Sequence, residues 1–275
     1  MSATNGMRDR LTEALKGARG GYAEVRFERT RSSRVAFRGP RLEVASESVD
    51  AGGCVRVLLK GHGWGIASFT SLDELPRMVE AAQAASRAVA LEEPIALADV
   101  PPRVDEVVPA LDGDPFEVSL AEKRRFVEGL NGLMLGASGR IADTQSSYYD
   151  ERREWYFANS EGTWLHEVRP EIGVSALATA REGDTIERYH DGVALRRGWR
   201  SVQGLEGLFK NAADMAVKLL AAPAVKGGTY PVVLDPRLAG VFVHEAFGHL
   251  SEATSSRGPR NATRLLRVRS KRTSA

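Results

Sequence analysis

Apolar residues recur at helical spacing in four separate stretches of the chain. The four stretches are residues 7–19, 71–93, 119–136 and 201–222. In each of them, apolar side chains three and four positions apart form one stripe, and charged residues occupy the other side. Each stretch is therefore predicted to form an amphipathic helix that packs against another part of the protein.

Short segments rich in β-branched and aromatic residues fill much of the remaining sequence. Five of them lie near the N-terminus, separated by Gly-Pro, Gly-Gly and Gly-His-Gly turns: residues 22–31, 33–39, 41–50, 54–61 and 64–69. This pattern is typical of an antiparallel meander. A second block of strands is predicted from Arg140 to about Tyr189, with a hairpin turn at residues 159–162.

Helices alternate here with blocks of several strands, which argues against a doubly wound parallel sheet. We expect an α+β fold, in which amphipathic helices pack on a mostly antiparallel or mixed sheet. Three regions are predicted: an α+β domain over residues 1–225, the start of a C-terminal domain over 226–253, and a basic tail over 254–275. In the second region, a strand over residues 227–235 is expected to lead into a helix that begins at Asp235-Pro236, a typical helix start.

The sequence HEAFGH, residues 244–249, lies in the second half of that helix. On a regular α-helix, two residues five positions apart point roughly 140° away from each other, so His244 and His249 could not bind one ion. A π-type turn with about 4.4 residues per turn would bring them within roughly 50°. We therefore predict a distorted helix end at residues 246–249, with Gly248 as the residue that allows the backbone to deform.

If both imidazoles bind zinc, the carboxylate of Glu245 lies beside the first ligand, where it could take a proton from an activated water. In the alternative interpretation, His244 and His249 are two surface histidines on an amphipathic helix. The other three histidines, His62, His166 and His190, are interpreted as solvated turn or partly solvated sheet residues.

Composition sets further limits on the protein. Cys54 is the single cysteine, so it can neither form an internal disulfide nor build a thiolate metal site alone. No apolar run is long enough for a signal peptide or a membrane span, and we expect a cytoplasmic protein. Residues 253–275 contain seven of the 38 basic residues and none of the 36 acidic ones, so the tail is basic and the preceding chain is acidic.

The motif resembles the metal-binding motif of the TldD/PmbA family of metallopeptidases, in which TldD-like members carry HExxxH and PmbA-like members lack it. Three further segments are similar to the N-terminal portion of TldD: residues 52–69, 148–170 and 230–245. The resemblance implies that His244 and His249 bind zinc and that Glu245 is the catalytic base. It also implies a cytoplasmic protease that cleaves flexible, unfolded peptides and works as a homodimer or heterodimer.

The resemblance has one important gap. TldD-like proteins continue into a C-terminal half that supplies a cysteine as the third zinc ligand, whereas this chain ends 26 residues after His249. Cys54 does not match that position, and Glu252 is either a third ligand or a solvated carboxylate. We therefore expect a truncated metallopeptidase that holds zinc weakly and is of doubtful activity alone.

Two other functions stay open at this point. The chain could be a non-catalytic partner of a full-length TldD/PmbA relative. It could instead bind nucleic acid through the arginines of residues 254–275, although a disordered or frame-shifted tail explains that composition more simply.

Overall fold

The computed structural model describes residues 3–251 of the chain. The chain divides into two units, Met1–Ala222 and Pro223–Ala275. The first unit holds a seven-stranded sheet and four α-helices, and the second holds a short helix that carries the HEAFGH sequence. The α+β class expected from the sequence is confirmed. The proposed three-region division stays a prediction, and its tail lies outside the described residues.

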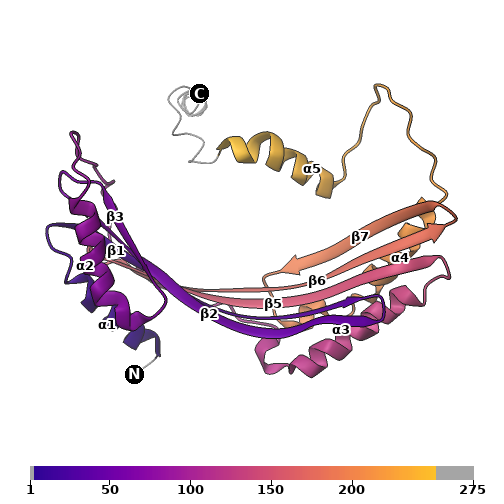
Figure 1. Cartoon of the computed structure of the whole chain (residues 1–275), viewed down its shortest axis with the longest axis horizontal. Coiled ribbons are helices and arrows are strands. Elements are labelled where there is room, and N and C mark those ends of the chain that lie inside the picture. The colour runs from indigo at the N-terminus through magenta and orange to yellow at the C-terminus, as the bar shows by residue number, and fades with distance from the viewer. Residues whose placement is uncertain (1–2, 252–275) are drawn as a thin grey trace. The chain divides into compact units, whose positions relative to one another are not determined.

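The strands of the first unit follow the order β3-β2-β1-β5-β6-β4 across the sheet, and β7 also pairs with β6. All pairs are antiparallel except β4 with β6, which is parallel. Figure 1 shows the long strands β1, β2, β5, β6 and β7 of this sheet. The sheet is thus mixed and mostly antiparallel. Its strands are β1 (Gly21–Arg38), β2 (Arg41–Leu59), β3 (Trp64–Phe69), β4 (Val104–Val107), β5 (Ile141–Asn159), β6 (Trp164–Glu182) and β7 (Thr185–Leu195).

Two of these strands, β1 and β2, are much longer than the segments that the sequence predicts. The two predicted strands 22–31 and 33–39 are one strand, β1, and the two over 41–50 and 54–61 are joined in β2. The predicted break at Gly52-Gly53 is wrong, because both glycines pair with β1 and stay inside β2. Backbone pairing with a neighbouring strand overrides the local preference of glycine and serine for turns.

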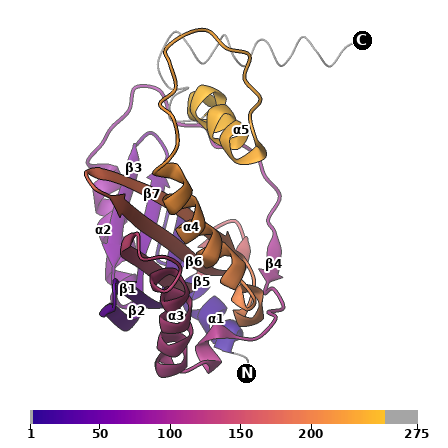
Figure 2. The ribbon, with the colours of Figure 1, turned by 90° about the vertical axis from the view of Figure 1, so that its right-hand side faces the viewer.

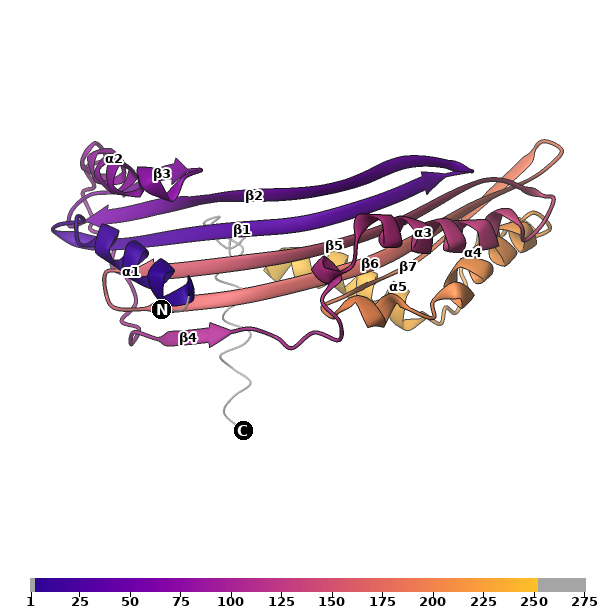
Figure 3. The same ribbon diagram turned by 90° about the horizontal axis from the view of Figure 1, so that it is seen from below.

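All four helices of the first unit pack on the same face of the sheet. They are α1 (Ala3–Leu15), α2 (Leu75–Arg87), α3 (Leu120–Leu135) and α4 (Glu206–Leu219). Figure 3 shows α1 and α2 near one end of the long strands and α3 and α4 near the other. Figure 2 shows α3 and α4 side by side against the sheet. The face therefore carries two hydrophobic clusters, one under each helix pair.

A buried polar network joins α3 to the sheet. The Lys123 ammonium lies 2.7 Å from Asp150 Oδ2 and donates to Ser33 Oγ at 2.9 Å. The hydroxyls of Ser33 and Tyr148 each donate to the same Asp150 oxygen at 2.6 Å. Both charged side chains are 0% exposed, so the ion pair is shielded from water; its partners on Asp150 Oδ2 compensate for part of the lost hydration, while Asp150 Oδ1 is buried without a hydrogen-bond partner.

This network predicts an alkaline loss of stability. Burial, followed by the charge of Asp150 and the hydrogen bond to it, raises the pKa of Tyr148. The tyrosine of the unfolded chain ionises near pH 10, whereas the buried hydroxyl keeps its proton. As the pH rises above about 10, the free energy of unfolding should therefore fall by about 1.4 kcal/mol per pH unit from this group. Urea unfolding at pH 9 to 11 measures this slope, and Tyr148→Phe should remove the Tyr148 contribution; an unchanged slope would contradict the assignment.

Candidate metal site

The helix that carries the motif, α5 (Pro236–Val243), begins where the sequence predicts. Asp235 has an extended backbone and its side chain accepts a hydrogen bond from the Leu238 amide at 2.7 Å. Pro236 follows in the first turn, where its missing N–H costs little. The predicted strand over residues 227–235 does not form: the structure shows no strand between residues 223 and 235. Apolar residues there have no neighbouring strand among the described residues, and a strand needs a partner for its backbone groups.

The helix changes its winding at the motif itself. Residues His244–Gly248 form a π-helical turn, in which the His249 N–H donates to the His244 carbonyl, five residues earlier. A short 3-10 helix, His249–Ser251, follows. The departure from α geometry that the five-residue spacing requires is therefore present in the structure.

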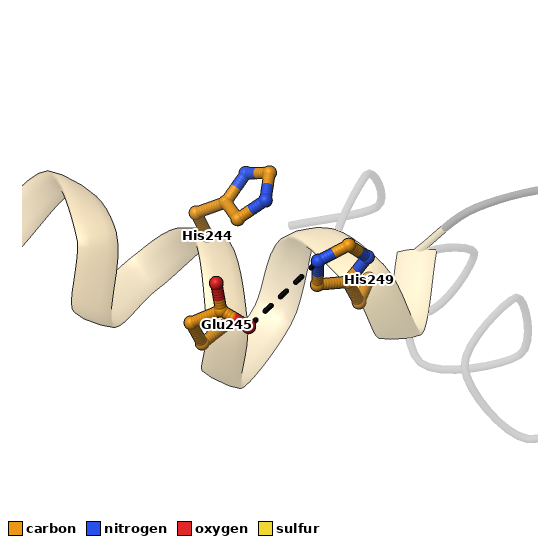
Figure 4. A group of neighbouring side chains, drawn as sticks. All are labelled: His244, Glu245 and His249. Atoms are coloured by element: carbon orange, nitrogen blue, oxygen red, sulfur yellow. Dashed lines mark ion pairs between the residues drawn. The ribbon is translucent and has the colours of Figure 1, made fainter.

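The wider turn brings the two histidines onto one side of the helix. Their ring centroids lie 4.6 Å apart with the planes at 74° to each other. Glu245 Oε2 lies 3.7 Å from His249 Nε2 (Figure 4). One ligand atom from each of His244, Glu245 and His249 lies within 4.8 Å of the other two. No other such group of three potential metal ligands occurs between residues 3 and 251.

The sequence suggests that Gly248 allows the backbone to deform, but the backbone at this position has no feature that only glycine can adopt. Its φ is not among the positive values found at seven other glycines, so its backbone conformation is open to any residue. A Cβ at this position would lie 3.6 Å from His244 Nδ1, which is an ordinary contact. The π turn therefore does not depend on glycine for steric reasons, although the bare backbone leaves the space beside the His244 ring open.

The site lies on an exposed surface with apolar neighbours. His249 and Glu245 are 53% and 64% exposed in their side chains, so both can rotate toward an ion. Phe242, Phe247 and Leu250 around them are each more than half exposed. Within the second unit as described, the apolar side chains of the motif helix are not buried.

The remaining candidate ligands lie elsewhere or outside the described residues. Glu252, the possible third ligand, and the basic tail are outside the described part of the chain. Cys54 belongs to β2, where it pairs with Arg26 and Ser68. The expectation that His166 is partly solvated is wrong.

His166 is only 6% exposed, because the ring stacks on Tyr156 with centroids 4.4 Å apart. Its Nδ1 lies 2.9 Å from Glu106 Oε1, on β4. A histidine in a strand between charged residues looked solvated in the sequence. In the folded protein, β4 pairs alongside β6 and places Glu106 next to the His166 ring. No local feature of the sequence predicts this pairing.

Family models match two parts of the chain. Residues 23–89 match the model described as PmbA/TldA metallopeptidase domain 1, and residues 113–220 match the PmbA/TldA metallopeptidase central domain. Together the two matches span more than half of the chain. The protein therefore belongs to the PmbA/TldD family of metallopeptidases.

Individual relatives agree with this assignment. A metalloprotease of Synechocystis sp. is 38% identical over 233 residues, which span 84% of this chain and 50% of that protein. A zinc metalloprotease TldD homolog of Saccharolobus solfataricus is 27% identical over 241 residues, again 84% of this chain and 50% of the relative. The chain thus spans about half the length of the curated relatives it matches.

Solved structures share the fold. A candidate modulator of DNA gyrase from Bacteroides thetaiotaomicron superposes with a TM-score of 0.76 at 20% identity, over 90% of this chain and 57% of that one. TldE from Thermococcus kodakarensis gives a TM-score of 0.55 at 15% identity, over 77% and 47%. At these identities the likeness establishes the architecture alone.

In the described part of the chain, no helix is both long and apolar enough to cross a membrane.

Proposed function

We propose that this protein is a zinc-dependent peptidase component in which His244 and His249 bind the metal and Glu245 is the general base. One observation carries the proposal: the π-helical turn places the candidate ligand atoms of these three residues within 4.8 Å of one another. Family membership supports it, because the relatives are named metalloproteases and one of them a zinc metalloprotease.

The donor set fits zinc. Imidazole nitrogens bind zinc at about 2.0–2.1 Å, so two of them on a tetrahedral ion lie roughly 3.3 Å apart. The exposed side chains of His244 and His249 can reach that spacing by small rotations. When bound, zinc lowers the pKa of a water ligand and polarises a carbonyl group of the substrate.

Glu245 has the position that a base needs. It lies within the π turn and its carboxylate is 3.7 Å from His249, so it could accept a proton from a water held near the two histidines. Its 64% exposed side chain leaves room for a substrate to approach. In this proposal Glu245 moves the proton and does not hold the metal.

The proposed site has two histidine ligands on this chain, whereas catalytic zinc sites normally use three protein ligands. We propose that the third ligand belongs to sequence corresponding to the other half of the relatives, where the resemblance places a cysteine. Zinc binding by this chain is then expected to be weak.

Zinc titration by calorimetry tests the assignment of the ligands. His244→Ala and His249→Ala should each weaken zinc binding about tenfold or more, because each removes one of only two imidazole ligands. His190→Ala is the matched control: it removes an exposed histidine on β7 in the first unit and should leave zinc binding unchanged. Zinc binding that is as tight in His244→Ala as in the parent protein would exclude the site.

Glu245→Gln separates metal binding from catalysis. The variant should still bind zinc, because both histidines remain, but should lose any hydrolysis of an unstructured peptide that the parent protein shows. Equal rates for the parent and the variant would contradict the role of Glu245 as base.

We further propose unfolded peptides as substrates, a dimer with itself or another family member, and a cytoplasmic location, as the family resemblance implies.

A further inference from the structure

A polar gap separates the two hydrophobic clusters on the helix-covered face of the sheet. The gap holds Arg29 and Arg31 of β1 and Arg152 of β5. Arg31 and Arg152 are direct partners in the β1–β5 register. Two like charges placed directly opposite each other on a sheet destabilise it unless an anion compensates them.

The guanidinium groups of these three arginines have few partners within the protein; Arg29 and Arg31 are open to water, and Arg152 is partly buried. In the described part of the chain none of them donates a hydrogen bond within the protein, and Arg29 has no ion pair there. The ion pairs of the other two are long: 3.5 Å from Arg152 to Asp114 and to Glu154, and 4.0 Å from Arg31 to Glu47. Arg152 Nε is buried without a hydrogen-bond partner.

The neighbouring carboxylates are already engaged by other donors. Asp114 Oδ1 accepts the Phe116 amide at 2.9 Å and so caps the 3-10 helix Pro115–Glu117. Glu154 Oε2 accepts the Tyr156 hydroxyl at 3.1 Å. The other oxygen of each acid lies 3.5 Å from Arg152, which is longer than a normal N–H···O hydrogen bond.

A cavity lies over these groups. It has a volume of about 330 Å³ and is lined by the three arginines, Phe116 and the acids Asp114, Glu117 and Glu154. The Phe116 ring lies under the Arg31 guanidinium, 4.6 Å from centroid to carbon, and holds it in place.

A second cavity of about 410 Å³ lies next to the first and shares Asp114, Glu117 and Arg152 as lining residues. The second cavity adds apolar lining from Val108, Pro109, Leu111, Val168 and Pro170. Both volumes fall in the lower part of the range of small-ligand sites. Arg152 thus lines both the arginine-rich cavity and the partly apolar one, which together form the proposed groove.

We propose that this gap is a binding site for a peptide carboxylate, which the three arginines receive while the apolar groove holds the adjoining side chain. Arginine binds carboxylates through two parallel hydrogen bonds, which no internal acid supplies here. The carboxylate also compensates the facing charges of Arg31 and Arg152. The acids of the lining balance the site overall, so it selects a single carboxylate next to an apolar group over a highly charged anion. This site lies entirely in the first unit and does not depend on the proposed zinc chemistry.

Calorimetric or NMR titration of the full chain with three short peptides tests the proposal. The probes are acetyl-Ala-Ala-Leu with a free C-terminus, its C-terminal amide, and the amide with aspartate in place of the central alanine. The free acid should bind with saturation, and the alanine amide about tenfold or more weakly, because it lacks the charge-assisted hydrogen bonds. Tight binding of the aspartyl amide would identify an acidic side chain as the source of the same carboxylate.

Two variants and one control complete the experiment. Arg29→Gln and Arg31→Gln should each weaken binding of the free acid about tenfold. Arg34→Gln is the matched control, because Arg34 is an exposed residue of the same strand on the opposite face. Thermal unfolding checks that all three variants fold. Equal affinity for the alanine amide and both carboxylate probes, parental affinity in both Arg29→Gln and Arg31→Gln, or no saturable binding of either carboxylate probe up to about 10 mM would overturn the proposal.

Discussion

Lys123→Ala is expected to lower the free energy of unfolding by about 3–5 kcal/mol, the cost of leaving one partner of a buried ion pair alone. Lys123 and Asp150 are both 0% exposed, and no other cation lies within ion-pair distance of Asp150 among the described residues. The loss would be a large share of the total stability of a domain, about 5–15 kcal/mol. Urea unfolding followed by circular dichroism measures it.

Two comparisons make this result specific. Arg124→Ala is the matched control, since Arg124 is the next residue on α3 and forms an exposed pair with Glu128 at 4.0 Å; it should cost less than about 0.5 kcal/mol. The double variant Lys123→Met with Asp150→Asn should recover part of the loss, because no charge is then buried. A Lys123→Ala effect as small as that of Arg124→Ala would show that water reaches the pair.

Gly65→Ala is expected to destabilise the protein by about 3 kcal/mol or more, at the upper end of overpacking effects. A Cβ at Gly65 would overlap the Ala82 carbonyl oxygen and the Ser86 backbone nitrogen, so α2 would have to move away from β3. That movement would also strain the Ser86 hydroxyl, which donates to the Gly63 carbonyl at 2.7 Å.

Thermal unfolding measures the effect of Gly65→Ala, with an expected fall in Tm of about 6 °C or more. Gly132→Ala is the control: Gly132 lies in α3, a Cβ there meets no atom within 4 Å, and alanine should stabilise the helix by about 0.5–1 kcal/mol. An unchanged Tm for Gly65→Ala would mean that the close approach of α2 to β3 is not required.

The local secondary structure of the site could be predicted from the sequence. Asp235 and Pro236 mark a helix start through their own backbone preferences, and the five-residue spacing of His244 and His249 demands a π turn if the two are to converge. Ser119 likewise accepts from the Glu122 amide at the start of α3, as its position before an amphipathic stretch indicates. The capping interactions are local, and the spacing requirement follows from helix geometry, so a reading of neighbouring residues is sufficient.

The length of the long strands could not be predicted in the same way. Serine and glycine near residues 32–33 and 52–53 look like turn residues, yet β1 and β2 run through them because each is paired with a neighbouring strand. The reverse holds for residues 227–235, whose apolar composition favours a strand that lacks a partner here. Pairing depends on segments far away in the sequence, and only the assembled sheet decides it.

The same distinction applies to charge. Lys123 lies at helical spacing from the buried Val127, Leu130 and Met134, but its charge predicts a side chain in water, and nothing in the sequence shows that Asp150 lies opposite it. The meeting of Arg31 and Arg152 depends likewise on the register of β1 with β5. The sequence by itself determined the amphipathic helices and the geometry that its histidine motif needs, since these depend on contacts within a few residues, and the order of helices and strand blocks along the chain indicated the fold class. Only the tertiary structure decided which charges meet, because a one-residue shift in register would move each side chain to the other face of the sheet.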